Sequence, residues 1–144
     1  MFRAAVVVLI LLSFLIACRN PGDLVMAVDV VDGDTIIVED GLHVRYIGID
    51  APEKNESFYL QSRKANEELV KGKGVRLEMD VSDKDSYGRL LRYVYVDGVF
   101  VNAELVRGGL AYAKAYPPDV KFQIYLEAVE REARQMRRGL WGQK

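Results

Sequence analysis

Two apolar runs rich in β-branched residues flank Asp32-Gly33-Asp34 and constrain the fold of this chain most strongly. Such runs on either side of an Asp-Gly pair are the strongest short-range signal for a β-hairpin. We therefore predict that residues 28–31 and 35–38 pair as antiparallel strands. A second turn at residues 39–41 leads into a strand over residues 43–49, which predicts a three-strand meander.

The remainder of the chain adds short strands and helical patterns. Strands are predicted at residues 75–79, 90–96 and 99–101, and helices at residues 56–72, 102–108 and 119–136. We expect Asn102 and Asp119 to cap the second and third helices, and Trp141 to pack the end of the chain down. This order favours an α+β protein whose helices pack on a β-barrel. The architecture that fits is the OB-fold, a five-stranded Greek-key barrel with about three helices.

The first 18 residues have the pattern of a bacterial export signal. Arg3 supplies a positive charge, residues 4–16 are apolar, and Leu-Ile-Ala-Cys ends the segment at Cys18. The apolar run reaches only about 20 Å as a helix, against a hydrocarbon core of about 30 Å. The ending resembles a lipobox, which implies cleavage before Cys18 and lipid modification of its sulfur. A plain secretory signal and an uncleaved anchor are the alternatives.

The expected organisation is therefore a signal peptide over residues 1–17, a tether over residues 18–23 with lipidated Cys18, and one domain over residues 24–144. The expected location is outside the cytoplasm, on a membrane that faces the periplasm or the cell exterior. Because residues 1–17 contain one arginine and no acid, the remainder has nineteen basic and twenty-one acidic side chains, a formal charge of −2. Bulk electrostatics therefore does not predict nucleic-acid binding, and any phosphate site must be local.

Two residue counts exclude several kinds of site. Cys18 is the only cysteine and His43 the only histidine, so a disulfide framework, a cysteine-rich zinc site and a serine or cysteine triad are all disfavoured. His43 follows a turn and fits an exposed strand residue better than a ligand. Arginines near the end of the last helix fit a solvated helix terminus better than a nucleic-acid patch.

Charged residues gather at the end of one predicted strand. Arg45 lies on the strand, and Asp50-Ala51-Pro52-Glu53 follows it, where proline ends ladder pairing. Asp-x-Pro-Glu is equally compatible with an ordinary turn beside a solvated arginine. Arg89 begins another strand after a polar loop, a position where a rigid scaffold commonly holds binding groups.

Three segments together resemble the staphylococcal nuclease (thermonuclease) family. They are Asp32-Gly33-Asp34-Thr35, the run from Arg45 to Glu53, and Tyr87-Gly88-Arg89. Further matches lie in residues 101–102, 105–111 and 139–141, so that the likeness extends from about Met26 to Trp141. The resemblance implies an OB-fold, calcium-dependent phosphodiesterase that cuts DNA and RNA to 3′-phosphate products.

The resemblance also implies roles for individual residues. The calcium ligands would be the carboxylates of Asp34 and Asp50 and the carbonyl of Ala51, hard oxygen donors that suit this ion. The catalytic groups would be Arg45, Glu53 and Arg89, and the substrate contacts Tyr87 and Tyr116. Two arginines can neutralise charge that develops on a phosphoryl group, and the glutamate would accept a proton from water or orient it.

Some features depart from the family pattern. Ala51 replaces a common threonine, Ser86 replaces a frequent basic residue, and the segment between Glu53 and the first helix is short. Rate and substrate preference are therefore less constrained than reaction class. The alternative function is an OB-fold that binds nucleic acid or a protein without cutting. We expect a monomer whose partners are DNA or RNA and, through Cys18, a membrane.

Overall fold

The predicted hairpin starts the barrel in the computed structural model, which describes residues 22–143. Strand β1 (Val25–Asp32) pairs antiparallel with β2 (Thr35–Val38), and Asp32 faces Thr35 at the turn. Strand β3 (His43–Tyr46) then pairs antiparallel with β2. The three-strand meander is confirmed.

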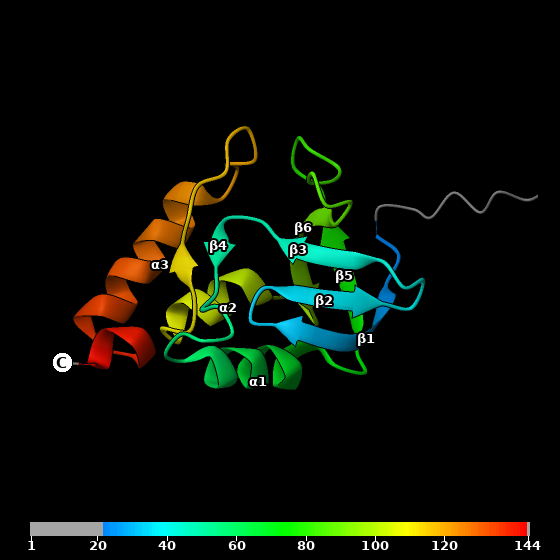
Figure 1. The fold of residues 1–144 in the computed structure, drawn as a ribbon. Coiled ribbons are helices and arrows are strands. Elements are labelled where there is room, and N and C mark those ends of the chain that lie inside the picture. Colours follow the sequence, from blue (N-terminus) through cyan, green and yellow to red (C-terminus); the bar gives the residue numbers. More distant parts are fainter. Residues whose placement is uncertain (1–21, 144) are drawn as a thin grey trace, which may run out of the picture.

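The barrel closes through a pairing between strands far apart in the sequence. Strand β5 (Gly74–Glu78) pairs with β1 and with β6 (Leu90–Val96), and β6 returns parallel to β3. The closed ring is thus β1-β2-β3-β6-β5, while β7 (Val99–Phe100) extends β6 as a hairpin (Figure 1). This is the predicted five-stranded OB-type barrel.

The strand predicted over residues 43–49 is shorter than expected. Strand β3 ends at Tyr46, and the chain turns at Gly48, whose φ is +78°. Ile49 then belongs to a separate strand, β4 (Ile49–Asp50), which pairs with β8 (Tyr112–Ala113) away from the barrel ladder. A Cβ at Gly48 would lie 2.5 Å from a methyl group of Leu126, so packing as well as backbone conformation favours glycine.

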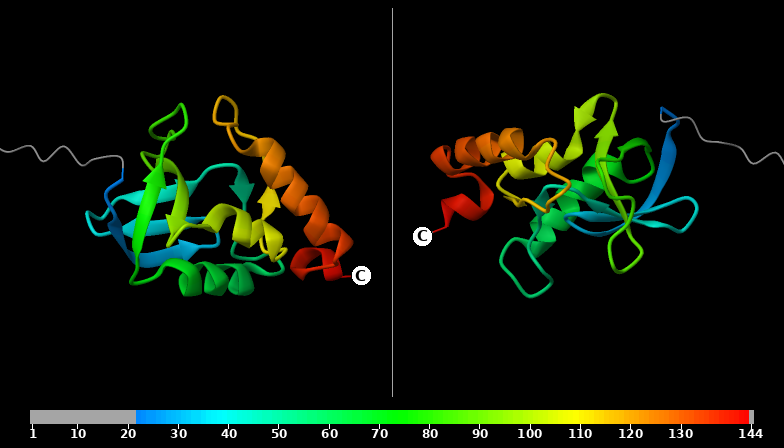
Figure 2. Two further views of the ribbon diagram at one scale, coloured as in Figure 1. Left: turned by 180° about the vertical axis from the view of Figure 1, so that it is seen from behind. Right: turned by 90° about the horizontal axis from the view of Figure 1, so that it is seen from above.

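Three α-helices lie against the barrel, as predicted. Helix α1 (Tyr59–Val70) runs beneath it, α2 (Val101–Arg107) lies beside it, and α3 (Gln123–Gln135) forms the outer wall at the opposite end from β1 (Figures 1 and 2). Helix α1 begins three residues later than predicted, after Phe58 at φ 68°. Among residues 22–143, no helix is long and apolar enough to cross a membrane.

The two predicted helix caps are wrong. Asn102 is fully buried, accepts a hydrogen bond from the Val94 amide (2.9 Å) and donates one to the Ile47 carbonyl (2.8 Å). Asp119 precedes α3 but accepts hydrogen bonds from the amides of Val81 and Ser82. Both polar side chains satisfy backbone groups of distant segments, and a local cap pattern carries no information about such contacts.

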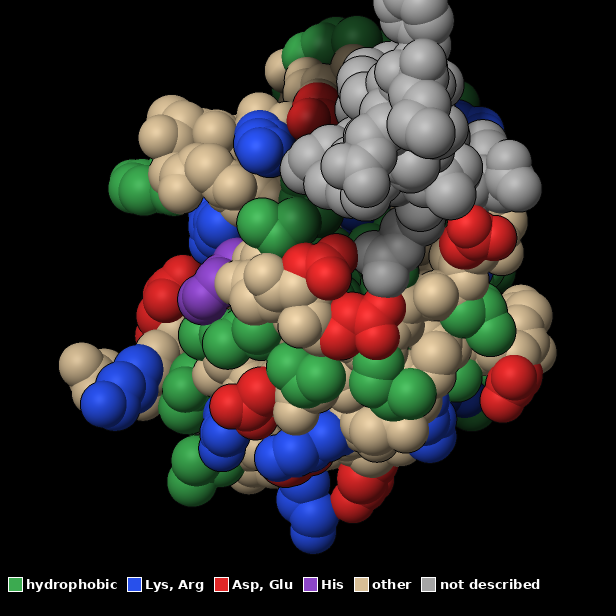
Figure 3. All heavy atoms as spheres, turned by 90° about the vertical axis from the view of Figure 1, so that its right-hand side faces the viewer, with side chains coloured by type: hydrophobic (Ala, Val, Ile, Leu, Met, Phe, Trp, Pro, Cys, Tyr) green, Lys and Arg blue, Asp and Glu red, His purple; other side chains and the backbone are tan. Residues whose placement is uncertain are grey.

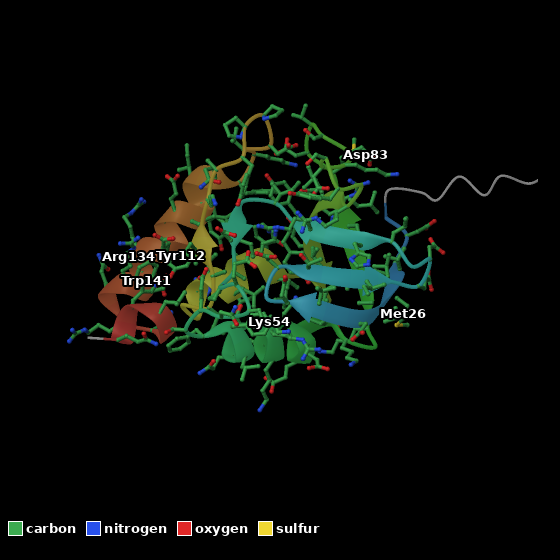
Figure 4. The ribbon with its side chains drawn as sticks, in the orientation of Figure 1. Met26, Lys54, Asp83, Tyr112, Arg134 and Trp141 are labelled. Carbon is green, nitrogen blue, oxygen red and sulfur yellow. The ribbon has the colours of Figure 1, made fainter. Side chains whose placement is uncertain are left out.

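The C-terminal segment packs on α3, as predicted for Trp141. A short 3₁₀-helix, η1 (Gly139–Gly142), places the Trp141 ring 3.9 Å from the guanidinium carbon of Arg134 and 5.4 Å from the Tyr112 ring (Figure 4). Arg134 also pairs with Glu130 at 2.7 Å. These contacts attach the end of the chain to β8, the strand that holds β4.

Candidate functional site

Asp34 lies at the base of the site, directly after the β1–β2 turn. Its side chain is 8% exposed, and its Oδ2 atom accepts a hydrogen bond from the Ala51 amide at 2.7 Å. The hydroxyl of Thr35 donates to Oδ1 at 3.2 Å. Burial raises the pKa of Asp34 to about 7, and the nearby carboxylate of Asp32 adds to this, whereas the charge of Arg45 acts against it. A second positive charge beside Asp34 would therefore be favourable.

Arg45 links the segments that meet at the site. Its Nη1 atom donates to the carbonyls of Tyr46 (2.8 Å) and Ile49 (3.0 Å), on both sides of the turn at Gly48. Its Nη2 atom lies 3.2 Å from Asp34 and 3.4 Å from Asp50. One guanidinium thus contacts two carboxylates from separate segments, Asp34 in the β1–β2 turn and Asp50 in β4.

Asp50 has a second cationic neighbour that the sequence analysis missed. The ammonium group of Lys114, just after β8, lies 3.0 Å from Oδ2 of Asp50. It also lies 5.3 Å from the centre of the Tyr116 ring. Hydrogen bonds to Asp50 and Tyr116 raise the pKa of Lys114. Lys114 and Tyr116 are two residues apart in an extended segment, so their side chains lie on one face. This spacing could have indicated that Lys114 lies near the predicted site residue Tyr116.

Arg89 is positioned by the polar loop before β6. Its Nε atom donates to Asp85 at 2.7 Å, and its guanidinium carbon lies 5.3 Å from the Tyr87 ring centre. Asp85 also accepts hydrogen bonds from the amides of Tyr87 and Arg89. Burial alone would raise the pKa of Asp85, but these hydrogen bonds lower it, so the carboxylate stays charged. Asp85, to which the sequence analysis assigned no role, therefore orients Arg89.

These side chains surround a cavity of about 230 Å³. Four of the predicted residues line it, namely Arg45, Tyr87, Arg89 and Tyr116. Arg45 lies on β3, Arg89 immediately precedes β6, which pairs with β3, and the two tyrosines come from loops. The result is a partly apolar hollow with two cations, a suitable size and character for a nucleotide phosphate with its sugar or base.

Glu53 is the predicted site residue that the structure does not bring into this group. It lies in the exposed loop between β4 and α1, and it is not among the residues that line the cavity. Within residues 22–143, the contact that it makes is a backbone hydrogen bond from the Glu56 amide at 2.8 Å. Its side chain is therefore available to a substrate but is not held in place by the fold.

The model of one protein family matches residues 43–143, and its description is staphylococcal nuclease homologue. The chain belongs to the staphylococcal nuclease family. The thermonuclease of Staphylococcus intermedius is 40% identical over 121 residues, which cover 78% of this chain and 72% of that protein. An uncharacterized endonuclease of Escherichia coli O157:H7 is 40% identical over 119 residues, 79% of this chain and 74% of the relative. Endonuclease YncB of Bacillus subtilis is 38% identical over 122 residues, 77% and 58% respectively.

The oxygen donors next to Arg45 in this staphylococcal nuclease-like site are of a chemical type that suits a calcium ion. Asp34 and Asp50 present carboxylates within 3.4 Å of one arginine nitrogen, and the buried Asp34 is stabilised in its charged form by any added cation. Carboxylates and the Ala51 carbonyl are hard ligands of the kind that calcium prefers. The set is sparse: within residues 22–143, no three His, Cys, Asp or Glu side chains gather closely enough to hold a metal. Substrate oxygens or water would have to complete the coordination shell.

Proposed function

We propose that this chain is a calcium-dependent nuclease that hydrolyses phosphodiester bonds in DNA, with RNA as a second substrate, and leaves 3′-phosphate products. The observation that carries the proposal is the cavity lined by Arg45 and Arg89, in which Arg45 also contacts the carboxylates of Asp34 and Asp50. The nuclease and endonuclease names of the relatives support the same reaction class.

The arginines act on the phosphate. Arg45 and Arg89 are each fixed by at least one carboxylate, so their guanidinium groups are already oriented when a phosphate enters. Preorganised cations stabilise the extra negative charge of the transition state without further rearrangement. Calcium bound by Asp34, Asp50 and the Ala51 carbonyl would add Lewis-acid polarisation of a phosphoryl oxygen and of water.

Glu53 and the tyrosines act on water and on the nucleotide. Glu53 lies in an exposed loop three residues after Asp50, and we infer that its carboxylate reaches the attacking water once substrate is bound and accepts its proton or orients it. Tyr87 is 84% exposed and Tyr116 38% exposed, and both line the cavity, so their rings are free to contact a sugar or stack on a base.

The test uses the chain from residue 19 onward with single-stranded DNA, double-stranded DNA and RNA, in calcium and in a chelator. We expect calcium-dependent cleavage, with Glu53→Ala and Arg89→Ala each reducing kcat about a hundredfold or more. Arg131→Ala, which removes an exposed arginine on α3, is the matched control and should retain full activity. Binding without cleavage, unchanged by either site substitution, would instead indicate a binding module.

We further propose that the protein is a monomer tethered to a membrane by a lipid on Cys18. Cys18 lies outside the described residues, and the proposal is supported by the Leu-Ile-Ala-Cys pattern of the sequence. Mass spectrometry of the membrane fraction should find a lipid-modified amino terminus at Cys18, and a Cys18→Ser variant should lose it. An intact Met1 terminus in the membrane fraction would exclude the lipid anchor.

A further inference from the structure

A second depression lies directly beside the cavity with the two arginines. Its volume is about 420 Å³, and it is lined by Gly41, Leu42, His43, Tyr87, Gly88 and Arg89. Tyr87 and Arg89 line both hollows. The two hollows therefore lie on either side of the same pair of side chains, and together they form one groove that we call the extended groove.

Strand pairing explains why His43 faces this groove. Side chains two apart on a strand point to the same face, so His43 and Arg45 project from the same side of β3, roughly 7 Å apart along it. In the parallel β3–β6 pair, Val44 lies beside Leu90 and Arg45 beside Leu91. Extended by one residue, this register places His43 opposite Arg89, in agreement with the presence of both residues in the lining of the second hollow. Arg45, Arg89 and His43 thus form a short row on one surface.

The His43 side chain makes no polar contact that would stabilise the described part of the fold. Its side chain is exposed, and within residues 22–143 no hydrogen bond or ion pair holds its imidazole. Figure 3 faces the end of the molecule that carries the β2–β3 turn, and there the histidine side chain, in purple, lies at the surface. Basic and acidic side chains are interspersed on this face, so a binding site here depends on specific side chains more than on overall charge.

We propose that His43 binds the nucleotide that neighbours the scissile phosphate on a single-stranded substrate. The cavity between the arginines accommodates about one nucleotide, whereas OB-folds commonly hold roughly 4–16 nucleotides of a single strand. A strand that leaves this cavity past Arg89 enters the hollow with His43. The imidazole donates a hydrogen bond to the next phosphate, and exposed Leu42 packs against the attached sugar or base. The inference rests on the proposed nuclease function, and it adds that the bound substrate extends at least one nucleotide beyond the cavity.

The test measures binding separately from cleavage. Fluorescein-labelled oligothymidylates of two and eight nucleotides are titrated with protein in a chelator, and anisotropy gives each Kd. His43→Ala should weaken binding of the eight-nucleotide probe about fivefold, as expected for one lost hydrogen bond to a charged group, and change the two-nucleotide probe less than twofold. His43→Lys should restore binding because lysine keeps a hydrogen-bond donor for the phosphate at this position. Lys64→Ala, on the exposed face of α1, is the control and should change neither Kd.

Two results would overturn the role of His43: an unchanged Kd for the longer probe, or an equal loss for both lengths. Thermal melting of each variant shows whether an equal loss reflects unfolding, and His43 is exposed, so no loss of stability is expected. With calcium, His43→Ala should raise KM for the longer strand and leave kcat unchanged. If the wild-type protein cleaves neither probe, the nuclease proposal fails, while the length dependence of Kd still decides the role of His43.

Discussion

Asp34 is subject to two opposing effects. Its burial disfavours the charged carboxylate, whereas Arg45 at 3.2 Å favours it. Burial has the larger effect, because the pKa of Asp34 is raised to about 7. Without metal, the folded protein therefore binds a proton at this position at a pH where the unfolded chain has already lost it. A buried carboxylate of this kind lowers stability near neutral pH in exchange for a site that attracts cations.

This balance predicts a pH dependence of stability. Because the folded-state pKa of Asp34 lies above the unfolded value of 3.8, its contribution to stability is present below about pH 4 and is lost as pH rises to about 7. In a chelator, the free energy of unfolding of wild type relative to Asp34→Asn should therefore fall between pH 4.5 and 7.5, by at most about 4 kcal/mol. Urea denaturation at several pH values measures this difference. A difference that stays constant would mean that Asp34 is ionised throughout.

Arg89 depends on its partner in the same loop. Removal of the carboxylate in Asp85→Ala should leave the arginine charged but poorly oriented, and we expect kcat to fall about tenfold, which is less than for Arg89→Ala. Steady-state kinetics should also show that Asp85→Ala together with Arg89→Ala is no worse than Arg89→Ala alone, because one interaction is lost only once. Asp83→Ala breaks the Asp83–Arg92 pair of the same loop and is the control. If the double variant instead loses kcat by the product of the two single effects, Asp85 does not act through Arg89.

At the scale of secondary structure, local sequence patterns correctly predicted the elements whose conformation depends on neighbouring residues. The Asp-Gly turn, the β-branched runs and the helical stripe of α3 correspond to elements of the fold, because turn conformation and side-chain period depend on near neighbours. The break at Gly48 was missed because it depends on packing against Leu126. The buried face of α1 contains Ser62 and Asn66, so its apolar stripe was imperfect for a reason that only tertiary contacts reveal.

Asn102 shows the difference between a local and a tertiary role, and it gives a third prediction. As a simple helix cap it would contribute about 1 kcal/mol. Instead it satisfies the Val94 amide and the Ile47 carbonyl in the interior, so Asn102→Ala should lower the free energy of unfolding by roughly 3 kcal/mol. Urea denaturation measures the loss, with exposed Asn55→Ala as the neutral control. A loss near 1 kcal/mol would favour the cap.

The residues of the candidate site also fall into two groups, those that the sequence indicated and those that only the structure revealed. Arg45, Arg89 and Asp34 were selected from recognisable sequence segments; the two arginines line one cavity, and Asp34 lies 3.2 Å from Arg45. The sequence analysis assigned no role to Lys114 or Asp85, because each acts through an ion pair, Lys114 with Asp50 and Asp85 with Arg89. Partners of this kind depend on where two segments meet in space, and one sequence does not contain that information.

In the whole molecule, the site lies where the barrel closes. The parallel β3–β6 pair brings Arg45 next to the segment that carries Arg89. The β4–β8 pair holds Asp50 beside Arg45. The charged groups therefore come from segments that meet only in the folded chain. A ligand that binds across them binds the folded state alone, so it must stabilise the entire domain.

Calcium should therefore raise the melting temperature of the wild-type protein. At a calcium concentration of about 100 times Kd, the expected gain is about 2.7 kcal/mol, which corresponds to roughly 10 °C for a domain of this size. The gain should be larger at pH 8 than at pH 6, because an ion at the proposed calcium site would bind the ionised carboxylate of Asp34 and would have to displace its proton at the lower pH. Differential scanning fluorimetry measures both shifts. Asp34→Asn with Asp50→Asn should abolish them, since the amides keep the shape of the site and lose its charge. An equal calcium shift in that double variant would locate the ion elsewhere, and the two carboxylates would then serve only to orient Arg45.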